Sequence, residues 1–176
     1  MLTFDQARQL VLKEIEAGQY EVKNDRLIII DEATIEKPYV WIFFYTSKRY
    51  FETNDIAFAI AGNGPKFVDK LSGKISCYFT SFSVEECIET YEEENKIWKI
   101  EIQNGFNLTN ENALRLKANL ELKNEELLKI IKQKRLVFDT GGWKRLNKLK
   151  MEFGSVGIET KIEIQNPRYQ SPVLPI

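Results

Sequence analysis

The chain has 176 residues and a formal net charge of −1, and 43% of its residues are hydrophobic and 29% charged, as in an ordinary globular protein. No segment approaches the roughly 18 consecutive apolar residues that a membrane-spanning helix needs. The N-terminus also lacks the basic start and unbroken apolar stretch of a signal peptide. We therefore expect a cytoplasmic protein without membrane contact.

Histidine is absent, and the cysteines are two, Cys77 and Cys87. The chain thus lacks the usual general base, the base that most often activates a serine or cysteine nucleophile, and the commonest zinc ligand. Two cysteines are too few for a disulfide framework, and we interpret them as reduced core thiols. We expect no catalytic residues, no metal and no cofactor. An enzyme that uses carboxylates or a lysine alone is the alternative.

Charge is unevenly distributed along the chain. Residues 1–95 hold 10 basic and 17 acidic side chains, whereas residues 96–176 hold 15 basic and 9 acidic ones. Because a composition shift at a polar stretch often marks a domain boundary, we predict a first domain over 1–95, a second over 96–165 and a tail over 166–176. A single domain with a charged connecting loop is the alternative.

The first predicted element is a helix over residues 3–17, with Thr3 as its N-cap and Gly18 at its end. Its apolar residues recur at helical spacing: Phe4, Ala7, Leu10, Val11 and Ile15.

Aromatic and β-branched segments then predict strands at Leu27–Ile30 and Tyr39–Tyr45, with a third short strand near Arg49–Glu52. On a single strand, the alternate residues Trp41, Phe43 and Tyr45 would share one face.

The segment AIAGNGPKFVDKLSGKI, residues 59–75, contains a Gly-Asn-Gly-Pro cluster. A phosphate-binding loop needs its glycines to open a helix, but here a proline and a predicted hairpin over residues 66–79 follow. We interpret the cluster as a structural turn, with an interaction loop as the alternative. Ser83 then caps a helix that has Glu85 and Glu86 in its first turn. Together these elements predict an α+β layer structure: helix, antiparallel sheet, helix.

The second half predicts the order β-α-α-β-α-β. The predicted elements are a strand at Ile97–Ile102, a helix over 110–120 capped by Thr109, a helix over 124–132, a strand at 136–138, a helix opening at Thr140 or Gly141, and a strand at Ile158–Ile164. The tail holds three prolines and should be extended, either disordered or laid along a surface.

Several segments of the first half resemble the immunity protein 35 family, which includes small YrhB-type heat-shock proteins. The matching segments are Phe4-x-x-Ala7, DEAT at Asp31–Thr34, WIFFY with Ser47 and Tyr50, AGNGPKFVDKLSGKI at Ala61–Ile75, and Tyr78 to Thr80. Two positions depart from the family pattern: Val40 stands where glycine is common, and Phe79 precedes Thr80 where Gly-Thr is common. The resemblance implies an antiparallel α+β fold and an immunity protein of a bacterial polymorphic toxin system. Such a protein binds and neutralises a cognate toxin. A stress-related chaperone or protein adaptor of YrhB type is the alternative that the same family implies.

The second half is similar to the C-terminal domain of the ribosomal stalk protein. The similarity lies in LRLKANLELKNEELLKIIK, LVFD and WKRLNKLKMEFGSVGIETKIEI, which follow one another in that order. Asn119–Leu122 stands where the stalk domain has a glycine-rich helix junction, so the resemblance implies the fold and not the binding of translation factors.

Candidate partner-binding residues come from four features. Glutamates on the predicted helix after Ser83 present an acidic face that would steer a basic partner, or are simply solvated. Aromatic side chains are core residues or, where exposed, interface anchors. The Gly-Asn-Gly-Pro turn is a rigid turn that could contact a partner. Asp31 and Glu32 are adjacent, so on a strand they would point to opposite faces, and we interpret them as a solvated strand end and not as a catalytic pair. The candidates are Glu32, Trp41, Tyr45, Tyr50, Asn63, Glu85, Glu86 and Glu89. A protein toxin is the expected partner, and a pI near 5.8 does not favour nucleic acid.

Overall fold

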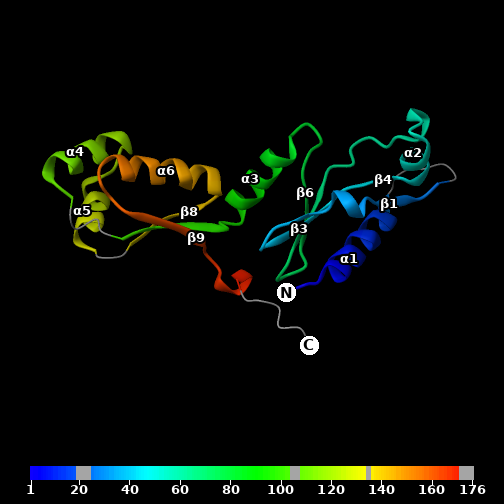
Figure 1. The fold of residues 1–176 in the computed structure, drawn as a ribbon, viewed down its shortest axis with the longest axis horizontal. Coiled ribbons are helices and arrows are strands. Elements are labelled where there is room, and N and C mark those ends of the chain that lie inside the picture. Colours follow the sequence, from blue (N-terminus) through cyan, green and yellow to red (C-terminus); the bar gives the residue numbers. More distant parts are fainter. Residues whose placement is uncertain (19–24, 104–107, 134–135, 171–176) are drawn as a thin grey trace. The chain divides into compact units, whose positions relative to one another are not determined.

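A computed structural model describes residues 1–18, 25–103, 108–133 and 136–170 (Figure 1). The chain divides into two compact units: unit 1 contains Met1–Cys87 and the residues from Arg168 onward, and unit 2 contains Ile88–Pro167. The chain therefore leaves unit 1 within a helix and returns to it close to the C-terminus. Both units combine helices with antiparallel sheets, which confirms the predicted α+β class.

Unit 1 contains two small antiparallel sheets, one with the strand order β2-β3-β5-β6 and one that pairs β1 with β4. Its elements are α1 (Phe4–Ala17), β1 (Leu27–Ile29), the 3₁₀ helix η1 (Asp31–Ala33), β2 (Ile35–Glu36), β3 (Val40–Phe43), β4 (Tyr45–Ser47), α2 (Lys48–Thr53), the 3₁₀ helix η2 (Ile56–Phe58), β5 (Lys66–Asp69), β6 (Ile75–Cys77) and the start of α3 (Val84–Glu94).

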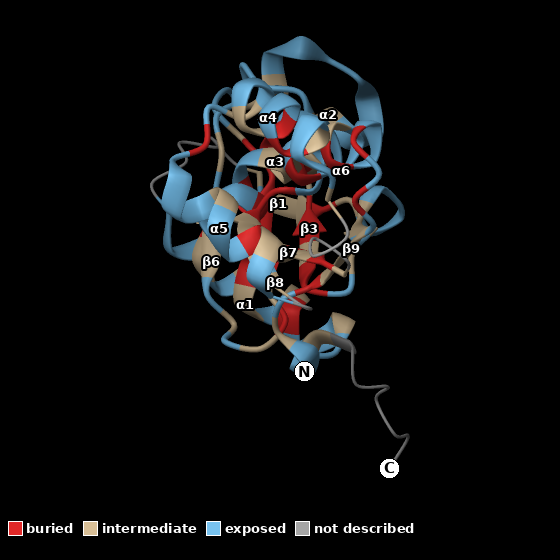
Figure 2. Cartoon of the chain, turned by 90° about the vertical axis from the view of Figure 1, so that its left-hand side faces the viewer, coloured by how far each residue is buried: buried red, intermediate tan, exposed pale blue. Residues whose placement is uncertain are grey.

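Helix α1 covers one side of these strands, as the sequence predicted. Thr3 and Gln6 form a capping box at its start, each side chain accepting a hydrogen bond from the other's backbone N–H. The apolar stripe of α1 packs into one core with strand residues of both sheets, and Figure 2 shows β3 largely in the colour of buried residues. The fully buried members of this core are Ala7, Val11, Ile15, Ile29, Phe43, Tyr45 and Val68.

Two strand predictions for unit 1 are wrong. The predicted strand Tyr39–Tyr45 is two strands that end and begin around Phe44, and they belong to different sheets. Trp41, Phe43 and Tyr45 nevertheless pack against the same core. The strand expected near Arg49–Glu52 is the helix α2, because the buried Ser47 hydroxyl accepts the Tyr50 N–H and caps a helical turn there.

The predicted hairpin is present, and it is closed by Asp69. The Asp69 carboxylate accepts the N–H groups of Leu71 and Ser72 at 2.9 and 2.7 Å, and Gly73 takes the left-handed conformation, with φ of +70°, that lets the strand return. On the paired strands, Lys66 lies opposite Cys77 and Val68 lies opposite Ile75.

Unit 2 begins with the remainder of α3, and after it comes the element order β-α-α-β-α-β that the sequence predicted. Its elements are β7 (Trp98–Ile102), α4 (Asn110–Asn119), α5 (Asn124–Lys132), β8 (Leu136–Gly141), α6 (Trp143–Ser155) and β9 (Thr160–Ile164). The strands form an antiparallel sheet in the order β8-β7-β9, and its apolar face packs on the helices. The buried core comprises Ile100, Ile102, Leu116, Leu122, Ile130, Leu146, Phe153, Val156 and Ile158.

Helix α6 begins later than the sequence predicted. The strand β8 runs on through Gly141, so Thr140 and Gly141 are strand residues, and Gly142 is the N-cap. The cap lacks a side chain of its own, and carboxylates from α3 replace it. Glu93 accepts the Gly142 N–H at 2.7 Å, and the buried Glu92 accepts the Trp143 N–H at 2.8 Å.

The described part of the tail is not extended. Pro167–Gln170 forms a 3₁₀ helix, η4, and the Tyr169 hydroxyl donates a 2.5 Å hydrogen bond to Asp69. The Tyr169 ring also meets the ring of Tyr39 edge-on, with centroids 6.3 Å apart. The remainder of the predicted tail, residues 171–176, lies outside the described residues.

Candidate partner-binding surface

The short helix α2 is a largely exposed part of unit 1, and hydrogen bonds to Asp25 and Ser47 hold its first turn in place. The Ser47 hydroxyl that caps α2 donates a 2.7 Å hydrogen bond to Asp25, and the same carboxylate accepts the Arg49 N–H at 3.0 Å. Burial alone would raise the pKa of Asp25, but the hydrogen bonds from Ser47, Arg49 and Arg26 outweigh it, and the pKa is lowered. Asp25 is therefore held as an anion that fixes the start of α2.

The segment after α2 is fixed in the same manner. Asn54 ends the helix in the left-handed conformation, with φ of 56°. Asp55 then accepts the Ala57 N–H at 2.9 Å and caps η2. The guanidinium of Arg49 lies over the Phe58 ring, 5.2 Å from its centroid, and ties η2 to α2.

A groove of about 340 Å³ lies beside this helix, and we call it the α2 groove. The described residues that line it carry no charge, and they are Ile30, Phe44, Tyr45, Thr46, Tyr50, Phe51, Asn54 and Asn63. Two large apolar side chains are exposed on the same helices, Phe51 at 48% and Ile56 at 84%. A rigid, uncharged groove next to exposed apolar side chains can accept an apolar side chain of a protein partner.

The Gly-Asn-Gly-Pro turn contributes one residue, Asn63, to the lining of the α2 groove. The Asn63 amide donates a 2.9 Å hydrogen bond to the carbonyl oxygen of Tyr45 and so ties the turn to β4. Gly64 packs against the backbone of Tyr78, where a Cβ atom would overlap with the carbonyl oxygen. The turn is thus structural, as expected, and it also contributes Asn63 to the groove.

The structure brings three of the predicted partner-binding residues together. Tyr45, Tyr50 and Asn63 all line the α2 groove. Tyr45 is only 1% exposed, because its ring belongs to the core under α1, so it does not offer a partner a free aromatic anchor.

Trp41 and Glu32 lie elsewhere in unit 1. The Trp41 indole is partly buried, donates to the carbonyl of Leu2 at 3.3 Å and has the ammonium of Lys70 4.1 Å from its ring centroid. Glu32 is exposed on η1.

The predicted acidic face has structural partners of its own. Glu86 accepts the Ser83 N–H at 2.8 Å, while its own N–H donates to the Ser83 hydroxyl, so the two form a capping box. In unit 2, Glu89 pairs with Lys144 at 2.9 Å and Glu93 with Arg145 at 3.1 Å. The hydrogen bond with Arg145 lowers the pKa of Glu93. Glu85 is exposed on the first turn of α3.

Four exposed apolar residues of unit 1 were not predicted as exposed from the sequence: Phe51, Ile56, Phe79 and Phe82. The signal for Phe51 was available, because Ser47 in front of a polar, aromatic segment is a helix N-cap pattern. Phe79 was predicted as the last residue of the hairpin over residues 66–79, and Phe82 follows it; nothing in their spacing separates them from core residues.

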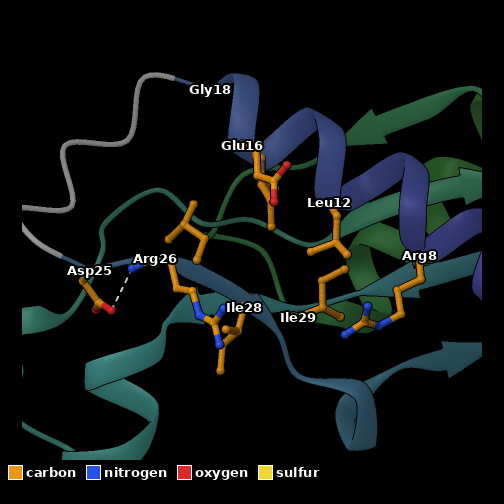
Figure 3. Close-up of a pocket in the computed structure, with 10 residues that line it drawn as sticks. Arg8, Leu12, Glu16, Gly18, Asp25, Arg26, Ile28 and Ile29 are labelled. Carbon is orange, nitrogen blue, oxygen red and sulfur yellow. Dashed lines mark hydrogen bonds between the residues drawn. The ribbon is translucent and has the colours of Figure 1, made fainter.

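A second groove of about 460 Å³ lies between α1 and β1 (Figure 3). Leu12 and Ile29 supply apolar lining, and Arg8 of α1 and Arg26, which directly precedes β1, line it as well. Arg8 makes a bidentate ion pair with Asp31, with distances of 2.7 and 3.1 Å. None of the predicted partner-binding residues lines this groove.

Among the described residues, no three acidic, cysteine or histidine side chains lie close enough together to hold a metal ion. In the same part of the chain, no helix has both the length and the apolar character needed to cross a bilayer.

These features define an antiparallel α+β protein that presents a preformed apolar groove. The chain belongs to the immunity protein 35 family, which residues 5–94 match. The uncharacterized protein YrhB of Escherichia coli strain K12 is 38% identical over 52 residues, which are 30% of this chain. The alignment spans 55% of that relative, so about half of its length is compared. No solved structure matches the chain.

Proposed function

We propose that this protein binds a cognate protein toxin of a bacterial polymorphic toxin system and neutralises it by covering the toxin's working surface. The observation that carries the proposal is the match of residues 5–94 to a family of immunity proteins. The α2 groove supports it, because the groove is uncharged, rigidly supported and flanked by exposed Phe51 and Ile56.

We also propose that the protein acts in the cytoplasm by binding alone, without catalysis or a cofactor. The complete lack of histidine supports this view, since most acid–base and nucleophilic sites depend on that side chain. Occlusion requires only a complementary surface, which exposed aromatic side chains supply well.

Co-expression with the toxin encoded by the neighbouring gene tests the proposal. We expect wild-type protein to restore growth and to copurify with the toxin. The double variant Phe51→Ser/Ile56→Ser should weaken binding by about 30-fold or more, as expected for loss of interface anchors. Met151→Ser, at an exposed apolar position on α6 of unit 2, is the matched control and should bind like wild type. Failure of the wild type to bind or rescue contradicts the proposal.

A chaperone or adaptor role is the second candidate, and the exposed apolar side chains of unit 1 favour it. This role predicts that the protein suppresses aggregation of unrelated, thermally unfolded enzymes and has no single tight partner. Light scattering of such an enzyme with and without the protein, next to a titration with the toxin, separates the two functions.

A further inference from the structure

The connection between β6 and α3 exposes two phenylalanines. We call residues Tyr78–Ser83 the Phe79 loop. Phe79 is 77% exposed and Phe82 is 52% exposed, although both rings are large enough to dominate a protein interface. One exposed apolar residue is ordinary, but two on a single turn form a patch that usually has a partner.

The Phe79 loop is held at both ends. At its first residue, the Tyr78 ring meets Phe67 edge-on, with centroids 5.0 Å apart. In the middle, the Phe82 N–H donates to the Phe79 carbonyl at 3.2 Å and closes a turn. At its last residue, the capping box between Ser83 and Glu86 fixes the start of α3. A loop that is already ordered loses little conformational entropy when it binds.

The charge around the Phe79 loop has a single sign along the chain. Residues 78–94 include six glutamates and neither lysine nor arginine. Glu89 and Glu93 pair with cations of unit 2, and the Glu86 carboxylate accepts the Ser83 N–H, whereas Glu85 is exposed three residues after Phe82. The negative charge of Glu85 favours a partner with lysine or arginine at the rim of its binding surface.

We propose that the Phe79 loop is a contact point for the toxin, inserting Phe79 and Phe82 into an apolar pocket rimmed by basic side chains. This inference rests on the proposed function and adds the chemistry of the partner. The two contacts with the toxin then differ in kind. The α2 groove receives an uncharged apolar group of the toxin, whereas the Phe79 loop inserts its own apolar side chains, next to negative charge, into the toxin.

The test measures the dissociation constant and association rate of the purified toxin with three variants. Phe79→Ser/Phe82→Ser should raise the dissociation constant by about 30-fold or more. Glu85→Lys should slow association several-fold and flatten its dependence on salt. Leu114→Ser, an exposed apolar position on α4, is the control and should match wild type. Circular dichroism and thermal unfolding check that each variant is folded.

Three outcomes overturn the inference. If the wild type binds the toxin and the Phe79→Ser/Phe82→Ser variant binds within twofold of it, the inference fails and the proposed function stands. If the wild type does not bind the toxin, both fail. If sedimentation shows that the double variant abolishes a dimer and leaves toxin affinity unchanged, the Phe79 loop joins copies of this chain instead.

Discussion

At Gly64 the absence of a side chain allows the Gly-Asn-Gly-Pro turn to lie against the backbone of Tyr78. A Cβ atom there would overlap with the Tyr78 carbonyl oxygen, and a backbone atom cannot move aside as a flexible side chain does. Gly64→Ala should therefore lower the free energy of unfolding by about 1–3 kcal/mol, as in other overpacked sites.

Urea unfolding measures this effect, with Gly154→Ala as the control. Gly154 lies within α6 and has open space where a Cβ would be, so alanine there should be neutral or stabilise by about 0.5–1 kcal/mol. Equal effects of the two substitutions would show that Gly64 is not a packing constraint.

Glu163 on β9 makes the free energy of unfolding depend on pH. Its carboxylate lies 2.6 Å from the ammonium of Lys161 and 2.8 Å from that of Lys99, and these two lower the pKa of Glu163 to about 2. A pKa below that of the unfolded chain, about 4.3, stabilises the fold above that value. The stabilisation is lost as the pH falls toward 2.

Glu163→Gln should therefore cost roughly 0.5–1 kcal/mol at pH 7, because the pair is partly solvated. The difference from wild type should fall to about half by pH 3, as linkage requires. Urea unfolding of both proteins at pH 7, 5 and 3 checks this, and a difference that stays constant would contradict it.

Individual contacts were only partly predictable from the sequence. Ser83 was predicted as a helix cap because the pattern Ser-x-x-Glu is local, and the structure pairs Ser83 with Glu86. Glu92 and Glu93 cap α6, which begins some fifty residues further along the chain, and no local sequence pattern predicts a cap from so far away.

At the scale of elements, helix α2 depends on Ser47. Its hydroxyl accepts the Tyr50 N–H and donates to Asp25, so Ser47→Ala removes both the cap and the support. We expect a loss of about 1–2 kcal/mol in the free energy of unfolding and weaker toxin binding, because α2 frames the α2 groove.

Thr109→Ala is the matched control for this substitution. Thr109 caps α4 in unit 2 by accepting the Asn112 N–H at 3.2 Å, and its loss should cost a similar free energy without changing toxin affinity. Calorimetric titration with the toxin distinguishes the two variants. A loss of affinity in both would mean that stability, and not the α2 groove, controls binding.

Elements with strong periodicity were predicted well, and short ones were not. The stripe of α1 and the alternation of β7 are each long enough to fix the type of element. The segment at Arg49–Glu52 is too short to show a period, and its aromatic residues favour a strand by propensity. The hydrogen bonds of Ser47, one from the Tyr50 N–H and one to the distant Asp25, stabilise the helix instead.

At the scale of the whole molecule, unit 1 is built from two separate segments of the chain, and neither composition nor periodicity indicates this. The change of charge sign lies near residue 95, whereas the compact units divide between Cys87 and Ile88 and again before Arg168. The second division depends on Tyr169, whose partner Asp69 lies one hundred residues earlier.

Tyr169→Phe tests how much this contact contributes. Burial and the hydrogen bond to Asp69 raise the pKa of Tyr169, and the loss of a hydrogen bond to a carboxylate should cost roughly 1–3 kcal/mol. Chemical denaturation followed by tyrosine and tryptophan fluorescence measures it. An unchanged midpoint would show that the hydroxyl contributes nothing to unit 1.

The return of the chain at Tyr169 bears on how fragments of this protein should be cut. A fragment trimmed to the family segment, residues 5–94, would lose the contact between the Tyr169 and Tyr39 rings and the hydrogen bond from Tyr169 to Asp69. Such a fragment would lose stability for a reason unrelated to toxin recognition. Supplying residues 167–170 as a separate peptide, or fusing them behind residue 94 through a flexible linker, would restore these two contacts.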